Sequence, residues 1–185
     1  MIANLQIHIL SRSQKEPIME SILTGQDASK LLKQNLTIAL FQPEIPGNVG
    51  SIARSCVATD TPLIIVGPIP FEITHSRLKR AGLDYWQHLN WCYLDTQEEF
   101  FEIFGSQRLV LTSVRGNYSY HEFQFSKEDI IVFGRETRGL DQALIDDPSH
   151  QSIFIPMWGK TRSLNIANSA TTILYEAHRR LGFPQ

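Results

Sequence analysis

Short segments that are apolar throughout alternate with amphipathic segments along most of this chain. The segments predicted to be strands are LTIALF (36–41), LIIVG (63–67), WCYL (91–94), RLVLTSV (108–114), DIIVFG (129–134) and SIFIPM (152–157). Helices are predicted at 47–60, 75–83, 96–104 and 137–145, and in the C-terminal stretch that ends at 183. A strand that is apolar throughout is buried on both faces. The alternation therefore predicts an α/β fold, a mostly parallel sheet with helices on both faces.

Composition and length indicate one soluble, folded domain. The chain has 185 residues, of which 42% are hydrophobic and 19% charged. No apolar run approaches the roughly 18 residues that a membrane span needs. The N-terminus has no positive region of the kind that precedes a signal peptide. Residues 1–34 are polar and weakly patterned apart from a possible short helix at 27–33, so we expect an N-terminal extension, a candidate for partial disorder, before one domain at 35–185.

Cysteine and histidine usage favours a cytoplasmic protein without a metal. Cys56 and Cys92 are far apart in the sequence, and we expect both to be reduced and buried. The six histidines are scattered, and none has metal-ligand spacing with another histidine or a cysteine. The net charge of −2 argues against a surface coated in positive charge. A nucleic-acid partner would have to be met by a local basic patch.

Polar, glycine-bearing loops follow several of the predicted strands. QPEIPGNVGSIARS follows the first strand, SVRG the fourth, GRETRGL the fifth and PMWGKTRSLN the sixth. Ligands of parallel sheets bind beyond the carboxyl ends of the strands, and glycine lets backbone approach a ligand closely. A single loop of this kind is ordinary in an α/β protein, but several on one sheet edge predict a ligand site. The dinucleotide, P-loop and G-x-S-x-G signatures are missing from the sequence.

The start of the last helix is unusually polar. Ser163, Asn165, Asn168 and Ser169 crowd small polar groups into what reads as its first two turns. One such residue would be explained by an N-cap. Four indicate that the start of this helix faces something other than the core.

Four segments of the sequence carry a resemblance to a known protein family. They are QPEIPGNVGSIARSC, LKRAGLDYW, FGRETRGL and IPMWGKTRSLNIANSATTILYEAHRRLGFP. In order and spacing, from about Leu36 to the C-terminus, the chain resembles the SPOUT (trefoil-knotted) RNA methyltransferases, and within them the small tRNA wobble-position 2′-O-methyltransferases of the TrmL type. The resemblance implies a C-terminal trefoil knot, S-adenosylmethionine as cofactor, and a homodimer with the site at its interface.

The resemblance also implies a reaction. It is 2′-O-methylation of the wobble nucleotide, a cytidine or modified uridine, in tRNA, with tRNA-Leu isoacceptors as the expected substrates. Two alternatives stay open: a SPOUT enzyme that acts on another tRNA or rRNA ribose, and a knotted RNA-binding factor that has lost catalysis. Intact family residues at the predicted site count against the second alternative.

Residues for cofactor and catalysis follow from the same match. The resemblance assigns cofactor binding to Thr112, Gly134, Glu136, Gly139, Ile155 and Ser163. It assigns the chemistry to Arg54, Asn48, Ser163, Asn165 and Tyr175. For Glu136 the expected task is to hold its loop or to orient cofactor and substrate. Tyr175 has an equally open alternative as a core aromatic residue.

Arg54 is the residue expected to act on the ribose. Related enzymes are described with this arginine as the base, but a guanidinium keeps its proton at neutral pH. It could act as a base if it were desolvated with the help of an RNA phosphate. Positioning of the ribose and stabilisation of developing negative charge are the simpler role, and a structural salt bridge is the other alternative. Asn48 lies six residues before Arg54, and we expect the two side chains to share one general direction.

Basic residues near the loops are candidates for RNA binding. One cluster comprises Arg135, Arg138, Lys160 and Arg162, and a second pair is Lys79 and Arg80. Many relatives have Pro where this chain has Arg135. Such clusters are usually solvated surface, but RNA needs positive charge somewhere on a protein of this net charge.

Overall fold

The computed structural model describes residues 36–73 and 84–183, which form seven strands and the helices that cover them. The strands are β1 (Thr37–Phe41), β2 (Leu63–Val66), β3 (Trp91–Leu94), β4 (Leu109–Thr112), β5 (Tyr118–Ser119), β6 (Ile130–Phe133) and β7 (Gln151–Phe154). The α-helices are α2 (Pro46–Ala58), α4 (Gln97–Phe104), α5 (Gln142–Asp146) and α6 (Ile166–Leu181), and η2 (Asp84–His88) is a 3-10 helix.

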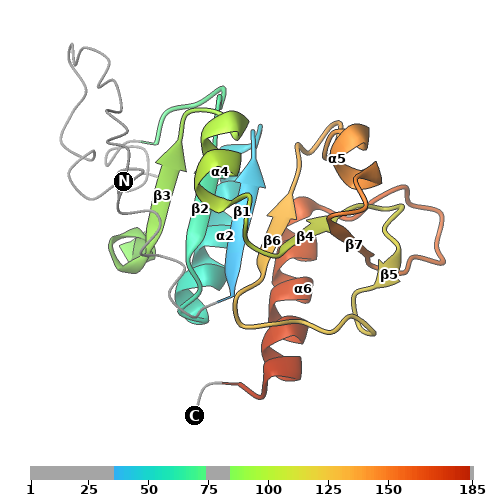
Figure 1. Ribbon diagram of the computed structural model, residues 1–185. Helices are drawn as coiled ribbons and strands as arrows, with labels where there is room; N and C mark the ends of the chain where they lie inside the picture. The colour runs from blue at the N-terminus through green and yellow to red at the C-terminus, as the bar shows by residue number, and fades with distance from the viewer. Residues whose placement is uncertain (1–35, 74–83, 184–185) are drawn as a thin grey trace, which may run out of the picture.

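The strands form one sheet in the order β3-β2-β1-β6-β4-β7-β5 (Figure 1). Every pair of neighbours is parallel. The order runs outward from β1 in one direction through β2 and β3, and in the other through β6, β4 and β7. The direction in which successive strands are added thus reverses between β1 and β6. In sheets of this kind, ligands bind at the carboxyl ends of the strands near such a reversal.

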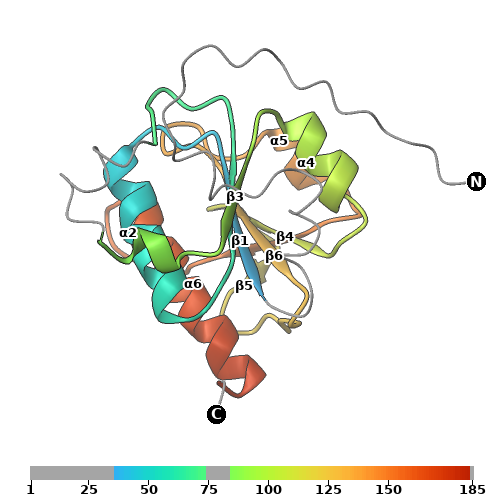
Figure 2. The ribbon, with the colours of Figure 1, turned by 90° about the vertical axis from the view of Figure 1, so that its left-hand side faces the viewer.

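Helices cover both faces of the sheet, as the sequence predicts. In Figure 2, α2 and α6 lie side by side on one face, and α4 and α5 lie on the other. One core cluster lies under α2 and α6 and includes Ile52 and Leu174. The other lies under α4, where Phe100 and Phe104 are fully buried.

The prediction for the two cysteines is also confirmed, and α4 has a side-chain cap. The side chain of Thr96 accepts a hydrogen bond from the Glu99 N–H and caps α4. Cys56 and Cys92 are free and buried. Burial raises the pKa of the Cys92 thiol to about 12 and also raises the pKa of the Cys56 thiol, so both sulfurs stay protonated packing groups.

Three expectations about the elements are wrong. The helix expected at 137–145 is only the short α5, because residues 134–140 form a tight turn in which Gly139 has φ +71°. The short strand β5 was not predicted. Ser163 precedes α6 instead of lying inside it, since Asn165 is the N-cap. The helices expected at 27–33 and 75–83 lie outside the described residues, as does the 1–34 extension.

The buried face of α6 consists mostly of small residues. It is made of Ala167, Ala170, Ile173, Leu174 and Ala177. Small alanines let the helix pack closely on the sheet and on α2. The side chain of Tyr175 is consequently turned outward and is 46% exposed, so its interpretation as a core aromatic residue is wrong.

Candidate active site

A cavity of about 670 Å³ lies at the carboxyl ends of β4, β6 and β7. Such a volume lies within the range of small-molecule sites. The loops after these three strands and the start of α6 all line it. Thr112, Gly134, Glu136, Gly139, Ile155 and Ser163, the residues assigned to the cofactor, are all among its lining residues. The predicted site at this sheet edge therefore exists as a cavity.

Close backbone packing shapes the loop after β6. The Arg135 N–H donates to the Gly139 carbonyl at 3.1 Å, and the Gly139 N–H donates to the Arg135 carbonyl at 2.8 Å. A Cβ on Gly134 would lie 2.1 Å from the carbonyl carbon of Gly139 and 2.2 Å from the nitrogen of Leu140. Only glycine fits at Gly134, so this loop presents backbone to the cavity.

Glu136 ties this loop to the one after β1. Its carboxylate accepts hydrogen bonds from the Glu44 N–H at 2.8 Å and the Ile45 N–H at 3.2 Å. A third bond comes from Asn48 Nδ2 at 2.9 Å. The predicted loop-holding role of Glu136 matches this geometry.

Glu44 completes a reciprocal link between the same two loops. Its carboxylate accepts from the Thr137 N–H and from the Thr137 hydroxyl, each at 3.0 Å. Each loop therefore supplies a carboxylate that holds the backbone of the other. Sequence reasoning did not identify Glu44, because a glutamate in a loop carries no signal of its partner.

Asn48 and Asn165 connect these loops to the start of α6. Asn165 Nδ2 donates to Asn48 Oδ1 at 3.0 Å, while Asn165 Oδ1 accepts from the Ala167 and Asn168 N–H groups. Asn48 is only 8% exposed, and both ends of its amide are engaged. We refer to Glu136, Asn48 and Asn165 as the polar bridge. Asn165 is the one member of the bridge from the polar start of the last helix, and Ser163 and Ser169 from the same stretch line the cavity.

The side chain of Arg54 lines a different cavity, of about 740 Å³, on the outer side of α2. Its guanidinium lies over the ring of Tyr85, 4.7 Å from the centroid. The Tyr85 hydroxyl donates to the Gly50 carbonyl at 2.8 Å and so fixes the ring. No carboxylate among the described residues pairs with Arg54, which leaves the salt-bridge alternative without support there.

The expectation that Asn48 and Arg54 share one direction is wrong. Six residues advance an α-helix by about 600°, which leaves the two side chains roughly 120° apart. Asn48 faces the cavity at the sheet edge, and Arg54 lines the outer cavity. Within one chain, the two residues do not meet at one site.

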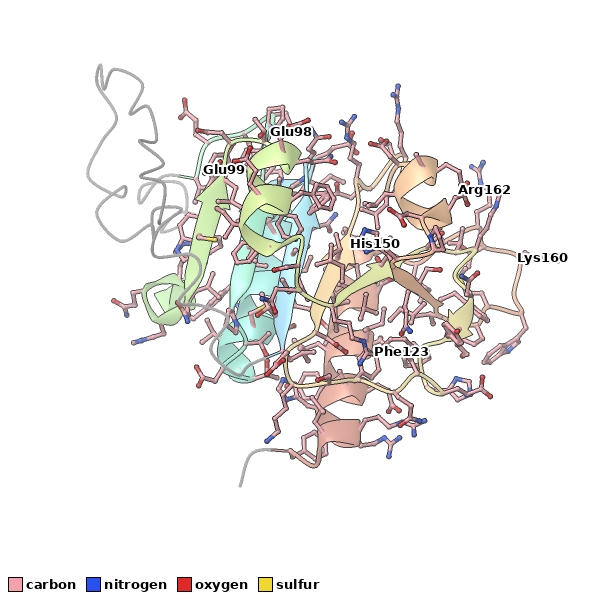
Figure 3. The ribbon with its side chains drawn as sticks, viewed as in Figure 1. Glu98, Glu99, Phe123, His150, Lys160 and Arg162 are labelled. Atoms are coloured by element: carbon pink, nitrogen blue, oxygen red, sulfur yellow. The ribbon has the colours of Figure 1, made fainter. Side chains whose placement is uncertain are left out.

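Arginines gather around the first cavity. Arg115, Arg135, Arg138 and Arg162 all line it. Arg135 donates to the Gln42 side chain. Figure 3 shows Lys160 and Arg162 on the loop between β7 and α6, with their side chains directed outward. Three of the predicted basic residues thus share one cavity, Arg115 adds to them, and Lys79 and Arg80 lie outside the described residues.

The described part of the chain, residues 36–73 and 84–183, contains no group of three histidine, cysteine, aspartate or glutamate side chains placed to hold a metal ion. Nor does any helix within it have the length and apolar character needed to cross a membrane.

The fold is therefore that of an α/β protein with a cavity of ligand size at the carboxyl edge of its parallel sheet, rimmed by arginines. The chain belongs to the SpoU rRNA Methylase family, whose sequence model matches residues 35–175. It is 40% identical over 151 residues to a putative tRNA (cytidine(34)-2'-O)-methyltransferase of Bacillus subtilis (strain 168), a match that covers 80% of this chain and 94% of the relative.

Solved structures agree with this assignment. One, reported for the 2-OH methylation of C/U34 on tRNA, has a TM-score of 0.74 and 38% identity, and the match covers 80% of this chain and 97% of that one. Another is the SpoU methyltransferase AviRb of Streptomyces viridochromogenes in complex with AdoMet. It has a TM-score of 0.69 and 29% identity, and the match covers 82% of this chain and 60% of AviRb.

Proposed function

We propose that this protein transfers a methyl group from S-adenosylmethionine to the 2′-hydroxyl of the wobble nucleotide, cytidine or modified uridine 34, of tRNA. The observation that carries the proposal is the cavity at the sheet edge, where all six residues assigned to the cofactor converge. The relatives named for this reaction match the chain over nearly their whole length. The tRNA-Leu isoacceptors are the expected substrates, and the cytoplasm is the expected compartment.

The residues of the first cavity fit the cofactor. The side chains of Leu140, Ile155 and Ile173 offer apolar surface for an adenosine, and the loop at Gly134 offers backbone groups for its polar edges. The bound cofactor supplies an electrophilic methyl group on a sulfonium. The polar bridge holds the surrounding loops in place before any ligand arrives.

Arg54 is proposed to act on the ribose as a positioning and charge-stabilising group. In the transfer, the ribose oxygen forms a bond to the methyl carbon, the carbon–sulfur bond breaks, and its electron pair stays on sulfur. The hydroxyl proton leaves to solvent. A guanidinium donates hydrogen bonds and does not accept this proton. Its positive charge stabilises the oxygen as negative charge develops.

A second copy of the chain is proposed to bring Arg54 to the reaction. Arg54 does not line the cofactor cavity of its own chain. The outward stripes of the two neighbouring helices are exposed: Gly47, Ser51, Arg54 and Ala58 on α2, and Asn168, Thr172, Tyr175 and Arg179 on α6. The small side chains of Gly47, Ser51 and Ala58 on α2 permit a close helix contact. A homodimer through these helices would place the arginine of one copy at the cavity of the other.

Two parts of the proposal rest on family membership. One is the threading of the C-terminal part of the chain into a trefoil knot. The other is the choice of the tRNA wobble ribose over another RNA site, which is supported by 40% identity to a wobble-type relative against 29% to AviRb. The intact polar bridge and Arg54 argue against a binding factor that has lost catalysis.

Transfer of labelled methyl from S-adenosylmethionine to total tRNA, followed by nuclease mapping of the labelled ribose, tests the proposal. Label at the wobble 2′-oxygen is the expected result. Label at another ribose would overturn the substrate and keep the chemistry. Failure of the protein to bind S-adenosylmethionine in calorimetry would overturn the methyltransferase proposal.

A further inference from the structure

Trp158 is the most exposed large hydrophobic side chain of the described residues. It is 93% exposed, and within the described residues it has no ring, cation or hydrogen-bond partner. The other two tryptophans, Trp86 and Trp91, are buried against each other with ring centroids 5.2 Å apart. An indole left in water forgoes the large hydrophobic gain that burial of an aromatic ring brings. This exposure indicates a side chain that is covered by a partner.

The place of Trp158 relates it to the methyl-transfer cavity. It lies on the loop between β7 and α6, directly after Met157 and shortly before Arg162. Both of these neighbours line the first cavity, while Trp158 does not. Its ring is therefore presented outside the cavity, on the loop that forms its edge.

The charges around Trp158 fit an anionic partner. Lys160 and Arg162 follow it on the same loop and extend outward (Figure 3). Arg115 and Arg138 come from the loops after β4 and β6 to the same cavity. Among the residues that the structure describes, no carboxylate forms an ion pair with any of these four side chains. Their charge is available for phosphate groups.

Proteins that bind single-stranded nucleic acid combine exposed aromatic rings with cationic side chains. Bases stack on the ring while lysine and arginine neutralise the phosphates. A paired helix hides the faces of its bases, so the ring selects an unpaired loop. We propose that Trp158 is a stacking platform for an unpaired base of the RNA substrate, beside the nucleotide whose ribose is methylated. This inference rests on the proposed function in that it takes RNA as the ligand.

The test compares variants of Trp158 in binding an anticodon stem-loop RNA. Loss of one base–aromatic stack corresponds to about a 5-fold to 150-fold rise in Kd. We expect that rise for Trp158→Ala and for Trp158→Leu, and near-normal binding for Trp158→Phe, which keeps an aromatic face. Phe183→Ala is the matched control, since Phe183 is also an exposed aromatic residue but lies beyond the other end of α6.

Intrinsic fluorescence gives a second readout that does not depend on activity. Because Trp86 and Trp91 are buried, acrylamide should quench Trp158 selectively. We expect the stem-loop to protect this emission and a fully paired duplex of equal length to leave it accessible. Unchanged quenching with bound stem-loop would overturn the proposal.

Other outcomes separate this inference from the proposed function. If the wild type methylates tRNA and Trp158→Ala retains the KM for tRNA, the stacking role is wrong and the enzyme remains. If Trp158→Leu binds RNA normally, the side chain acts by apolar packing. A changed affinity for S-adenosylmethionine, or dissociation of a dimer in sedimentation, would instead assign Trp158 to the cofactor or to a second copy, and either would overturn the proposal. If stem-loop binding depends on Trp158 but the protein transfers no methyl group, the stacking role stands and the proposed reaction is wrong.

Discussion

The two cavities beside α2 are built in opposite ways. On the inner side, Asn48 uses both ends of its amide in hydrogen bonds to Glu136 and Asn165, which tie the loops after β1 and β6 to the start of α6. On the outer side, Arg54 has the ring of Tyr85 beneath it, and no carboxylate of the described residues holds its charge. One side of α2 therefore borders a cavity whose loops are held by hydrogen bonds, and the other side borders a cavity whose arginine has no carboxylate partner among the described residues.

This difference indicates that the two cavities have different roles. The inner cavity has the rigidity that a small cofactor of constant shape requires. Arg54, in contrast, keeps donors free for a substrate that arrives later. Substitutions on the inner side should therefore lower stability and cofactor affinity together, while substitutions on the outer side should lower the rate alone.

The largest effect is expected for Arg54→Ala. Loss of a group that stabilises charge in the transition state costs about 100-fold to 1000-fold in kcat. Cofactor affinity in calorimetry and the midpoint of thermal unfolding should stay at wild-type values, because Arg54 contacts neither the inner cavity nor a carboxylate of the described chain. Lys127→Ala, which removes an exposed basic side chain outside the lining of both cavities, is the control. Full activity of Arg54→Ala would remove the assigned role.

Glu136→Ala tests the inner side. The change removes the acceptor of three hydrogen bonds, two of them from backbone N–H groups. Hydrogen bonds to a charged group are worth about 1.5–3 kcal/mol each when buried, and these are partly exposed, so we expect a loss of about 3 kcal/mol in the free energy of unfolding. Urea denaturation measures it.

Cofactor affinity should fall in the same variant, since both tied loops border the cavity. Glu102→Ala on α4 is the control, because Glu102 is exposed and lies outside the cavity lining. A Glu136→Ala protein that is as stable as the wild type, with unchanged cofactor affinity, would show that the polar bridge does not organise the site.

Two glycines offer a matched pair at the same cavity. Gly134→Ala forces a methyl group against backbone atoms of Gly139 and Leu140, and we expect it to cost about 2 kcal/mol or more in unfolding free energy. At Gly159, on the loop after β7, an added methyl meets nothing within 4 Å. Gly159→Ala should be neutral or should stabilise by about 0.4–1 kcal/mol. Equal thermal stability of the two variants would contradict the close packing described at Gly134.

The smallest effect is expected far from both cavities, near the end of α6. His178 Nε2 lies 3.0 Å from the hydroxyl of the buried Thr61. Burial lowers the pKa of His178 below its ordinary value near 6.5. The neutral ring is thus favoured in the folded state, and its contribution to stability is fully present above pH 6.5.

That contribution is lost as the pH falls from about 6.5 through the lowered folded value, because the unfolded chain then binds a proton more readily. The slope cannot exceed about 1.4 kcal/mol per pH unit. Urea midpoints measured from pH 8 to pH 5 should therefore fall less steeply for His178→Gln than for the wild type. Parallel curves would exclude His178 as the source.

The sequence was informative where long patterns decide the structure. Six strands could be predicted because each is a run of buried apolar residues, and the site edge followed because loops after parallel strands meet. β5 was missed because two residues show no periodicity. The helix expected at 137–145 was wrong because Leu140, Leu144 and Ile145 have helical spacing, yet Leu140 is buried by a turn and only Leu144 and Ile145 lie in α5.

Pairings between distant residues could not be predicted. The six-residue spacing of Asn48 and Arg54 on a helix already separates their side chains by roughly 120°. Nothing in the order of residues, however, shows that Asn48 bonds to Glu136. The exposure of Trp158 is likewise a property of a loop conformation, which the apolar pattern does not encode.

The polar bridge also has a consequence for how the protein is made. Its bonds join residues 88 and 117 positions apart, so its members leave the ribosome at very different times. Chains are synthesised from the N-terminus at about 5–20 residues per second, and contacts between distant residues form slowly. The strands β1 to β3 are complete long before Asn165 is added. A nascent chain that has not reached Asn165 therefore lacks a complete polar bridge, and the loops around the cavity are tied to α6 only after that residue has been added.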